Sequence, residues 1–543
     1  TDLYIVYAPV FYVLEFETES AFVQIDNNSF QQITSNQSFL LNGYLVGQTI
    51  IKSNLFWQIT GNKSLIFLTS QNPWSSLEVI SNELVECQGI GLISYDSSYS
   101  AGVLIQNNTI TSNHIGRILI SLLLQKWDGK IEFAGNTVKN NEFYCMFSTQ
   151  LNVFDIQAPR SYEGSAFIMS DNLFEANIFI ESRPFVDQVY QNHFMHLGLA
   201  KASAHFTNTT FDGLTMQWDG NLIRIASSTI SFQQCVFNNI LNYDDEGVIM
   251  LVTQSLTVNA TRFDNVTGDV KGTYGSIFNI ARDPYFTSSV DVIIQNSLFK
   301  NTTSLVGSVL IADKILLNLT ANDNAFINNR QLLGAAIYIT NSIFERFIFD
   351  NFSLSVTDNP TEYTNLNFNF DFIEFKNCSG SASVSNSLMV VSPSDAAIFT
   401  IYESSQLEFK LSGVYLTSDE TSTALAFDSH IILLKANTGT ISFDEVTVMN
   451  LTNFDLPFIH FDCNTDKLIT FSGSKITATE LKLRDFSKFV QWEALGVITI
   501  TGNQGSLNMT LENSIFNDIW TDYSGGGIAN LKALGATLNI LNC

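Results

Sequence analysis

The sequence predicts an all-β fold, a parallel β-helix solenoid of about 20 coils with roughly 26 residues in each coil. Three observations in the 543 residues support this fold class. A phenylalanine followed within three residues by asparagine recurs along the chain, and a glycine followed by small or apolar residues precedes many of these marks. Between the marks lie short runs of alternating polarity, rich in β-branched and aromatic residues, which are typical of strands.

The phenylalanine mark is most regular in the middle of the chain, where successive copies are 26, 36, 27, 23 and 26 residues apart. Each coil of a β-helix places an inward side chain over that of the preceding coil, so identical residue types stack. We therefore predict a ladder of stacked rings in the core, formed by Phe237, Phe263, Phe299, Phe326, Phe349 and Phe375.

The asparagine of the mark is expected at a sharp corner between two strands. Asparagine tolerates the left-handed backbone conformation better than most residues do. Its side chain can also hydrogen-bond to neighbouring chain, here from one coil to the next. The sequence therefore predicts corners of the form Phe-x-Asn, with the phenylalanine inside and the asparagine at the bend.

This pattern resembles the right-handed parallel β-helix of the pectin-lyase-like superfamily. It is also similar to the repeats of bacterial polymorphic outer-membrane adhesins and of large protist surface proteins. The resemblance covers most of residues 20–378 and returns near 505–543. It implies a shared fold and leaves the function to be argued from the residues.

The mark divides the chain into three expected segments. Residues 1–378 should form a β-helix with recurring Phe-x-Asn corners, and 379–504 a continued but more irregular β-helix. Regular coils are expected to resume at 505–543 and to stop in mid-coil, because residues 537–543 match only the first part of an earlier coil.

Composition and charge exclude several classes of protein. With 45% hydrophobic and 14% charged residues the chain can bury a large core, so general disorder is excluded. The 52 acidic against 26 basic residues give a net charge of −26, which repels nucleic acids and anionic lipids, and no basic patch is evident in the sequence. The aliphatic stretch at 118–124 is far shorter than the roughly 20 residues of a membrane span. We expect no nucleic-acid partner and no transmembrane segment in this chain.

Thirteen Asn-x-Ser/Thr sites are the strongest functional signal. A chain rich in Asn, Ser and Thr produces some by chance, but several fall on the predicted corners, where the side chain would face solvent. We therefore expect a secreted or cell-surface protein with N-linked glycans. The candidate acceptors are Asn27, Asn36, Asn62, Asn107, Asn208, Asn259, Asn265, Asn301, Asn318, Asn351, Asn377, Asn450 and Asn508.

The six cysteines are too far apart in the sequence for bridges between adjacent coils, and none forms Cys-x-x-Cys. Buried thiols next to corners are the favoured interpretation, with loop-borne or intersubunit disulfides as the alternative. The residues are Cys87, Cys145, Cys235, Cys378, Cys463 and Cys543.

A metal site and a cofactor are not expected. Three histidines lie near each other in the sequence and are candidate metal ligands: His193, His196 and His205. However, His193 and His196 are three residues apart, and such residues on a strand point to opposite faces. The acidic run 244–246 lacks the spacing of a calcium loop and is interpreted as a solvated turn.

The sequence lacks most of the motifs found in β-helical enzymes that cleave polysaccharides. The run Asn-Thr-Asp of the polygalacturonase pattern occurs at 464–466, but Gly-His-Gly and Arg-Ile-Lys are absent, as is the paired-arginine pattern of pectate lyases. The sequence thus predicts no catalytic residues, and we expect the protein not to be an enzyme. A lyase or hydrolase built from carboxylates on stacked coils remains the minor alternative.

These observations favour a structural glycoprotein, a rod that assembles end to end or laterally into a fibre, coat or appendage. Its partners would be copies of itself or other surface glycoproteins. The bias toward Asn, Phe, Ile and Leu fits an AT-rich genome such as that of a protist. The alternative is an adhesin or glycan-binding β-helix, which predicts a lateral groove lined by tyrosine and tryptophan. The tryptophans are Trp57, Trp74, Trp127, Trp218, Trp492 and Trp520.

Overall fold

A computed structural model describes most of the chain, which divides into two compact units, Thr1–Gly272 (unit 1) and Thr273–Cys543 (unit 2). The described residues are 3–5, 11–13, 22–35, 40–45, 47–61, 63–71, 75–116, 118–144, 152–180, 193–217, 220–242, 247–268, 277–281, 289–356, 371–391, 397–418, 430–435, 439–449, 451–454, 459–462, 468–483, 497–501, 506–521, 529–531 and 535–543. In these residues the secondary structure consists of β-strands. None of them belongs to a helix long and apolar enough to span a membrane.

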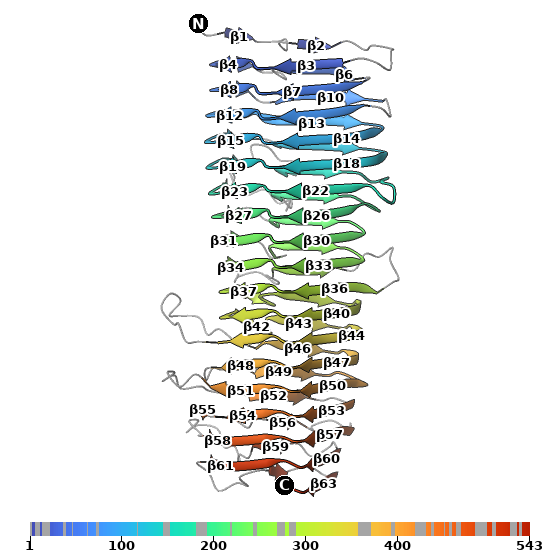
Figure 1. Cartoon of the computed structure of the whole chain (residues 1–543), viewed down its shortest axis with the longest axis vertical. Helices are drawn as coiled ribbons and strands as arrows, with labels where there is room; N and C mark the ends of the chain where they lie inside the picture. The colour runs from blue at the N-terminus through green and yellow to red at the C-terminus, as the bar shows by residue number, and fades with distance from the viewer. Residues whose placement is uncertain are drawn as a thin grey trace, which may run out of the picture. The chain divides into compact units, whose positions relative to one another are not determined.

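Each unit is a parallel β-helix, in which every coil passes in turn through three sheets (Figure 1). Sheet 1 of unit 1 contains β2 (Phe11–Val13), β6 (Leu41–Leu45), β10 (Ser64–Ser70), β13 (Gly91–Ser97), β17 (Ile120–Leu124), β21 (Phe154–Gln157), β25 (Met195–Gly198), β29 (Ile223–Ala226) and β32 (Ile249–Val252). Sheet 2 of unit 1 contains β3 (Phe22–Asp26), β7 (Gln48–Lys52), β11 (Ser76–Ile80), β14 (Ser100–Gln106), β18 (Trp127–Ala134), β22 (Ala166–Ser170), β26 (Ser203–Thr207), β30 (Thr229–Gln233) and β33 (Ser255–Asn259).

Sheet 3 of unit 1 bends at a second corner, so that many coils supply two short strands to it. It contains β1 (Leu3–Ile5), β4 (Ser29–Gln31), β5 (Ile33–Ser35), β8 (Leu55–Trp57), β9 (Thr60–Gly61), β12 (Glu83–Val85), β15 (Thr109–Thr111), β16 (His114–Ile115), β19 (Thr137–Lys139), β20 (Glu142–Tyr144), β23 (Leu173–Glu175), β24 (Ile178–Ile180), β27 (Thr210–Asp212), β28 (Thr215–Met216), β31 (Val236–Asn242) and β34 (Arg262–Thr267).

Unit 2 repeats the same three-sheet pattern. Its sheet 1 contains β35 (Phe278–Ala281), β39 (Leu310–Asp313), β43 (Ile337–Thr340), β46 (Ile373–Lys376), β49 (Ala397–Tyr402), β52 (His430–Lys435), β56 (Ile459–Asp462), β59 (Ile498–Thr501) and β62 (Ala529–Leu531). Its sheet 2 contains β36 (Val290–Gln295), β40 (Leu316–Asn322), β44 (Ile343–Asp350), β47 (Ser379–Ser385), β50 (Leu407–Ser412), β53 (Gly439–Asp444), β57 (Leu468–Ser474), β60 (Ser506–Glu512) and β63 (Gly535–Leu541). Its sheet 3 contains β37 (Leu298–Lys300), β38 (Thr303–Val306), β41 (Ala325–Ile327), β42 (Arg330–Leu333), β45 (Ser353–Ser355), β48 (Leu388–Val391), β51 (Tyr415–Ser418), β54 (Thr447–Met449), β55 (Thr452–Phe454), β58 (Thr477–Leu483) and β61 (Ile515–Thr521).

The parallel β-helix expected from the sequence is therefore confirmed, with fewer coils than expected. Among the described residues, sheets 1 and 2 of each unit hold nine strands each, against the roughly 20 coils predicted for the whole chain. The reason is coil length, because hydrogen-bonded residues of adjacent coils are separated by 26, 28, 36 and 41 residues. The division between the two compact units falls after Gly272. Strands β47 to β59 carry the three-sheet pattern through the segment expected to be irregular.

Strand pairing explains the alternating sequence runs. Each strand pairs in parallel with strands of the neighbouring coils, as β11 does with β7 and β14. Side chains of a strand point alternately to the two faces of a sheet, and only one face of these sheets borders the core. In β40 the residues accordingly alternate between half-buried and buried along the whole strand. The outward residues can therefore be polar without cost, which is why the runs alternate.

The phenylalanine ladder forms in unit 1. Phe174, Phe211, Phe237 and Phe263 occupy the same inward position of β23, β27, β31 and β34. Consecutive rings are nearly parallel, with centroids 4.9, 4.8 and 4.8 Å apart. Stacked rings at such distances stabilise the core beyond their burial alone. Phe237 and Phe263 are thus stacked as expected.

In unit 2 the ladder is shorter than the sequence predicts. Phe299 and Phe326 stack in sheet 3 with ring centroids 5.2 Å apart, but the next residue at this position is Leu354. Phe349 and Phe375 were wrongly placed on the ladder, because Phe349 lies in sheet 2 and Phe375 in sheet 1. Spacing of about one coil does not distinguish the three sheets, since all three supply an inward residue once per coil.

Candidate functional site on the outward corners and faces

The candidate acceptor asparagines face outward wherever they are described. Seven of the described ones are at corners with positive φ, and three are on outward positions of sheet 2 strands. None of these ten side chains is buried. The corner acceptors are Asn27, Asn107, Asn208, Asn265, Asn301, Asn351 and Asn377. The strand acceptors are Asn259, Asn318 and Asn508. Asn36, Asn62 and Asn450 lie outside the described residues.

The corner conformation explains why these asparagines are exposed. A residue with φ near 55° turns the chain from one sheet into the next, and the residue that follows points into the core. Asn107 has φ of 54° and is exposed, whereas Asn108 after it is buried. Asparagine and glycine adopt this conformation more readily than other residues do. The corner at 107–108 thus presents its first asparagine to solvent and buries its second.

The outward amide groups hydrogen-bond along the stack of coils. Nδ2 of Asn208 donates to Asp171 Oδ1 at 2.7 Å. Nδ2 of Asn377 donates to Asn341 Oδ1 at 2.8 Å. Attachment of a glycan to Nδ2 replaces one of its two N–H donors, so the remaining N–H can keep one such bond. Glycosylation is therefore compatible with the corner geometry.

The inward asparagines form a separate ladder that the sequence analysis did not distinguish from the outward ones. Each donates from Nδ2 to a backbone carbonyl of the preceding coil, as Asn108 does to Val79 O at 2.8 Å. Its Oδ1 accepts the backbone N–H and the Nδ2 of the preceding ladder residue Asn82 at 2.9 and 3.0 Å. The pairs Asn107-Asn108 and Asn140-Asn141 show the two roles side by side, whereas the other members of the inward ladder follow Ser, Gly, Asp or Ala. The buried members in unit 1 sheet corners are Asn54, Asn82, Asn108, Asn136 and Asn172, and at the second corner Asn113, Asn141 and Asn177.

Four of the six cysteines are described, and each follows directly after a corner residue with positive φ. Cys87, Cys235 and Cys378 are buried free thiols, which agrees with the favoured interpretation. Burial raises the pKa of Cys87 and Cys235 to about 11 and that of Cys378 to about 12. Cys543 is exposed, and Cys145 and Cys463 lie outside the described residues.

Of the three histidines considered as ligands, His193 and His196 lie close to each other, with ring centroids 5.8 Å apart. His193 is buried, and its Nδ1 accepts the backbone N–H of Asn221 at 3.0 Å. His196 is on the outer face of β25, where its Nδ1 is 3.0 Å from Asp155 Oδ1. His205 is 2.8 Å from the hydroxyl of Ser231. Among the described residues no group of three or more His, Cys, Asp or Glu could hold a metal ion.

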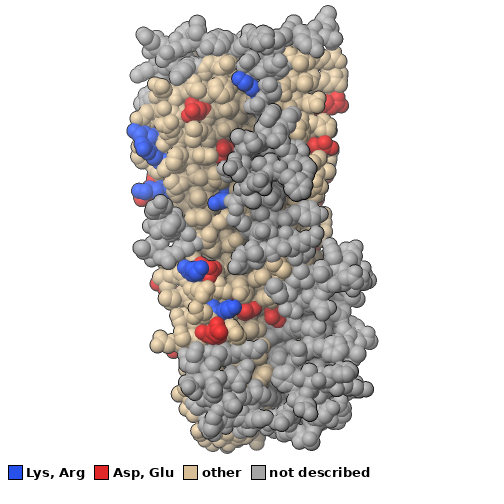
Figure 2. All heavy atoms as spheres, turned by 180° about the vertical axis from the view of Figure 1, so that it is seen from behind, with Lys and Arg blue, Asp and Glu red and all other residues tan. Residues whose placement is uncertain are grey.

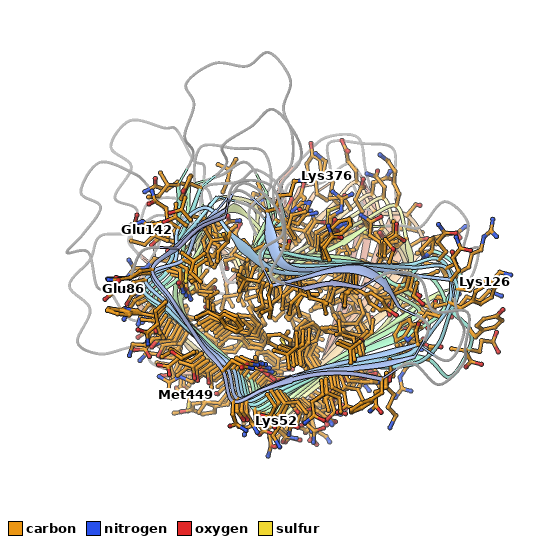
Figure 3. The ribbon with its side chains drawn as sticks, turned by 90° about the horizontal axis from the view of Figure 1, so that it is seen from above. Lys52, Glu86, Lys126, Glu142, Lys376 and Met449 are labelled. Carbon is orange, nitrogen blue, oxygen red and sulfur yellow. The ribbon has the colours of Figure 1, made fainter. Side chains whose placement is uncertain are left out.

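A hollow lies on the outer side of sheet 1 in unit 2, with a cavity volume of about 610 Å³. Acidic and basic side chains lie next to each other on the face of sheet 1 shown in Figure 2, and Lys376 projects from this face in Figure 3. The polar part of the lining comes from strand ends and the corners after them: Asn279, Asp313, Lys314, Tyr338, Thr340, Asn341 and Lys376.

Asp313 is the best-anchored group of this hollow. Its Oδ1 accepts hydrogen bonds from Thr340 Oγ1 at 2.7 Å and Asn341 Nδ2 at 2.8 Å, and its Oδ2 is 3.2 Å from Lys314 Nζ. Burial alone would raise the pKa of Asp313, but these hydrogen bonds and Lys314 outweigh it and lower the pKa below its usual value. The hollow therefore keeps a fixed carboxylate with the Lys314 ammonium group beside it, an arrangement that can hydrogen-bond sugar hydroxyls.

Other residues singled out in the sequence take no part in these sites. Trp127 is fully buried, and Trp57 is half-buried with its Nε1 donating to Glu86 Oε2 at 3.2 Å. The acidic run 244–246, the run 464–466 and Trp74, Trp218 and Trp492 lie outside the described residues. Trp520 belongs to β61, and its side chain is outside them too.

Comparison with known proteins does not assign this chain to a family. No protein-family model matches the sequence, and no curated protein matches it closely enough to show a relationship. The function is therefore inferred from the residues and geometry of this chain.

Proposed function

We propose that this protein is a structural glycoprotein, secreted or on the cell surface, whose β-helical coils present N-linked glycans along their outward corners. The observation that carries the proposal is the placement of the acceptors, because all ten described ones are exposed or half-buried. A random set of asparagines would include buried ones, since thirteen of the described asparagines are buried and none of these thirteen is an acceptor. No catalytic step is part of this proposal.

The proposal includes assembly into a fibre, coat or appendage. Coils pair through backbone hydrogen bonds between parallel strands, and the same pairing can join coils of two copies end to end. Exposed apolar residues on sheet 3 of unit 2 could make lateral contacts between copies. Leu388 and Tyr415 are adjacent there and are 46% and 38% exposed. Glycans on the corners would keep the other faces soluble.

Glycopeptide mass spectrometry of the protein from a secreting eukaryotic host tests the first part. We expect glycans on exposed acceptors such as Asn107 and Asn208. Asn140 is the matched control, because it sits at a corner with φ of 56° but is followed by Asn141 and Glu142 and lacks the acceptor motif. Unmodified asparagine at every acceptor would refute the glycoprotein proposal.

Electron microscopy of native, concentrated protein tests the assembly. Filaments or sheets in which copies are joined are expected. Monodisperse particles of a single copy at high protein concentration would contradict assembly and leave the glycosylation result untouched. Replacing Leu388 and Tyr415 by serine separates the two modes, since lateral but not end-to-end association should weaken.

Glycan binding is the second candidate function, and the hollow of unit 2 is the observation that favours it. Tyr338 offers a ring, Lys376 an ammonium group that is 5.5 Å from the ring centroid of Tyr402, and Asp313 a fixed carboxylate. On a glycan array we expect binding that Tyr338→Ala abolishes and that Lys410→Ala, a change of an exposed lysine on sheet 2, leaves intact. An array without any binding would exclude this candidate.

A further inference from the structure

Three exposed aliphatic side chains on the outer face of sheet 2 in unit 2 lie next to acceptor asparagines. They belong to β36, β44 and β57, and Ile293 is 41%, Ile343 56% and Leu468 47% exposed. Keeping such side chains in water is unfavourable in proportion to their apolar area. Single exposed aliphatic residues are common on proteins, so what covers these three has to be argued from what lies beside them.

The coil that follows Ile343 carries the acceptor Asn377. Asn377 and Asn341 occupy the same corner of adjacent coils, with φ of 52° and 50°. Nδ2 of Asn377 donates to Asn341 Oδ1 at 2.8 Å, so the atom that receives the glycan points toward the preceding coil. Ile343 lies two residues after Asn341 and is opposite Ser379, the last residue of the acceptor motif. A sugar attached to Asn377 therefore begins beside the exposed side chain of Ile343.

Ile293 has the same relation to the acceptor Asn318. Nδ2 of Asn318 donates to Asp291 Oδ1 at 2.8 Å, again toward the preceding coil. Ile293 lies two residues after Asp291 and is opposite Thr320, the last residue of this acceptor motif. Because side chains alternate along a strand, Asp291 and Ile293 share the outer face, while Val292 between them is buried. Two acceptors thus have an exposed isoleucine at the same relative position on the preceding coil.

Leu468 lies diagonally from a third acceptor, Asn508. It is opposite Ser506, which is two residues before Asn508 on the same face of β60. The exposed Leu388 of sheet 3 is different, because it is opposite Tyr415 and neither β51 nor the corner before it contains an acceptor motif. The apolar side chains next to acceptors are therefore distinct from those assigned to lateral contact.

We propose that the innermost sugar of the glycans on Asn318 and Asn377 packs on Ile293 and Ile343 of the preceding coil. An N-linked glycan begins with N-acetylglucosamine, whose ring C–H groups and acetyl methyl group form an apolar surface. Its ring is similar in length to the spacing of adjacent coils, about 4.8 Å. Packing the isoleucine against this surface removes apolar area from water.

The corner hydrogen bond holds the sugar in place. The N–H that remains on Nδ2 after glycosylation can keep its bond to the preceding coil, and this bond keeps the sugar over the isoleucine. The glycan thereby becomes part of the outer face of sheet 2 and stabilises the two coils that it touches. This inference rests on the proposed glycoprotein function and adds to it a binding site for the sugar on the protein itself.

A double-mutant cycle on the full chain from a secreting eukaryotic host tests the proposal. Ser379→Ala removes the acceptor motif but keeps Asn377 and its bond to Asn341, whereas Ile343→Ser removes the apolar side chain and keeps the motif. We expect Ser379→Ala to speed hydrogen exchange in β44 and β47 about fivefold. With Ile343→Ser already present, the same change should have less than about a twofold effect. Equal effects in the two backgrounds would overturn the proposal.

The same four proteins made in a bacterial host without N-glycosylation separate the sugar from direct contact between the two substituted residues. The coupling between the substitutions should disappear there, and equal coupling in both hosts would overturn the proposal. Thr320→Val and Ile293→Ser form the corresponding cycle at Asn318, with exchange measured in β36 and β40.

Asn351 is the matched control acceptor. Its Nδ2 also donates to the preceding coil, at Asp323 Oδ1, but the residue two positions after Asp323 is Ala325. Ala325 is opposite Ser353, the last residue of this acceptor motif. Ser353→Ala should change exchange in β41 and β45 by less than about twofold, because little apolar area loses its cover. A loss as large as that of Ser379→Ala would show that any glycan protects its coil, which contradicts the proposal.

Two further measurements decide what covers the isoleucines. Glycopeptide mass spectrometry should find glycans on Asn318 and Asn377. Unmodified asparagine at both positions overturns this inference, whereas the proposed function fails only if every acceptor is unmodified. Exchange in β44 that slows as the protein concentration rises would identify a second copy as the occupant and would also overturn it. Circular dichroism spectra that match the natural chain show that each variant is folded.

Discussion

His193 illustrates how a single buried polar residue depends on its neighbours. Its side chain is fully buried in unit 1, and its Nδ1 accepts a hydrogen bond from the backbone N–H of Asn221. Its Nε2 has no hydrogen-bond partner among the described residues. Burial lowers the pKa of His193 to about 3, and the nearby Arg224 and His196 act in the same direction while Asp155 opposes them. The imidazole is therefore neutral in the folded protein at ordinary pH.

This depressed pKa makes stability depend on pH. The unfolded chain takes up the proton near pH 6.5, before the folded chain does, so the contribution is present above that pH and is lost as pH falls toward about 3. The loss amounts to up to about 1.4 kcal/mol per pH unit. Urea unfolding at several pH values should show this slope in the natural chain and a shallower one in His193→Gln. Equal slopes in the two proteins would contradict the assignment.

The buried thiols give a second test at the residue scale. Because burial raises the pKa values of Cys87, Cys235 and Cys378, little thiolate is present at neutral pH, and reagents are also kept out. We expect iodoacetamide to label the exposed Cys543 in the native protein and these three only after unfolding, as read by peptide mass spectrometry. Labelling of Cys235 in native protein would show that the corner opens.

At the scale of the elements, the corners hold adjacent coils together. The side-chain amide of a ladder asparagine such as Asn108 makes three hydrogen bonds to the preceding coil. Its Oδ1 accepts from the backbone N–H and the Nδ2 of Asn82, and its Nδ2 donates to the carbonyl of Val79. Buried donors and acceptors that lose their partners are costly. The ladder therefore fixes the turn of each coil relative to its neighbours, while the stacked rings of sheet 3 fill the interior.

Replacing Asn108 by alanine should lower the free energy of unfolding by about 2–4 kcal/mol, because buried backbone and side-chain groups are left without partners. Asn107→Gly is the matched control at the preceding residue, since glycine keeps the positive φ, and we expect a change below about 1 kcal/mol. Chemical denaturation followed by circular dichroism measures both. A similar loss in the two variants would mean that the ladder bonds are not what stabilises the corner.

Hydrogen exchange can locate this effect. In a solenoid each coil contacts only its neighbours, so destabilisation is expected to be local. In Asn108→Ala, amides of β11, β14 and β18 should lose more protection than those of β30 and β33, which lie several coils further along unit 1.

At the scale of the whole molecule, charge is the property that matters most. The chain has a net charge of −26, and the ion pairs among the described residues are mostly exposed, as Lys475 with Glu445 at 2.6 Å is. Exposed pairs of this kind contribute little to stability. Repulsion among the acidic residues is thus only weakly offset within the protein.

Screening by salt should therefore stabilise the protein. Raising sodium chloride from low to moderate concentration is expected to increase the free energy of unfolding by on the order of 1 kcal/mol, because it weakens repulsion between like charges. The urea midpoint measures this change, and an equal osmolarity of an uncharged sugar serves as the control. A midpoint that falls with salt would show that attractive pairs outweigh the repulsion.

The sequence by itself determined the coil, its inward and outward faces and the exposure of the corner asparagines. These follow from local chemistry, because alternation along a strand and tolerance of positive φ depend on a residue and its immediate neighbours. The tertiary structure decided which sheet holds Phe349 and Phe375, and it assembled the hollow around Asp313. Residues that pair across adjacent coils are 26 to 41 residues apart, so they have no fixed separation in the sequence.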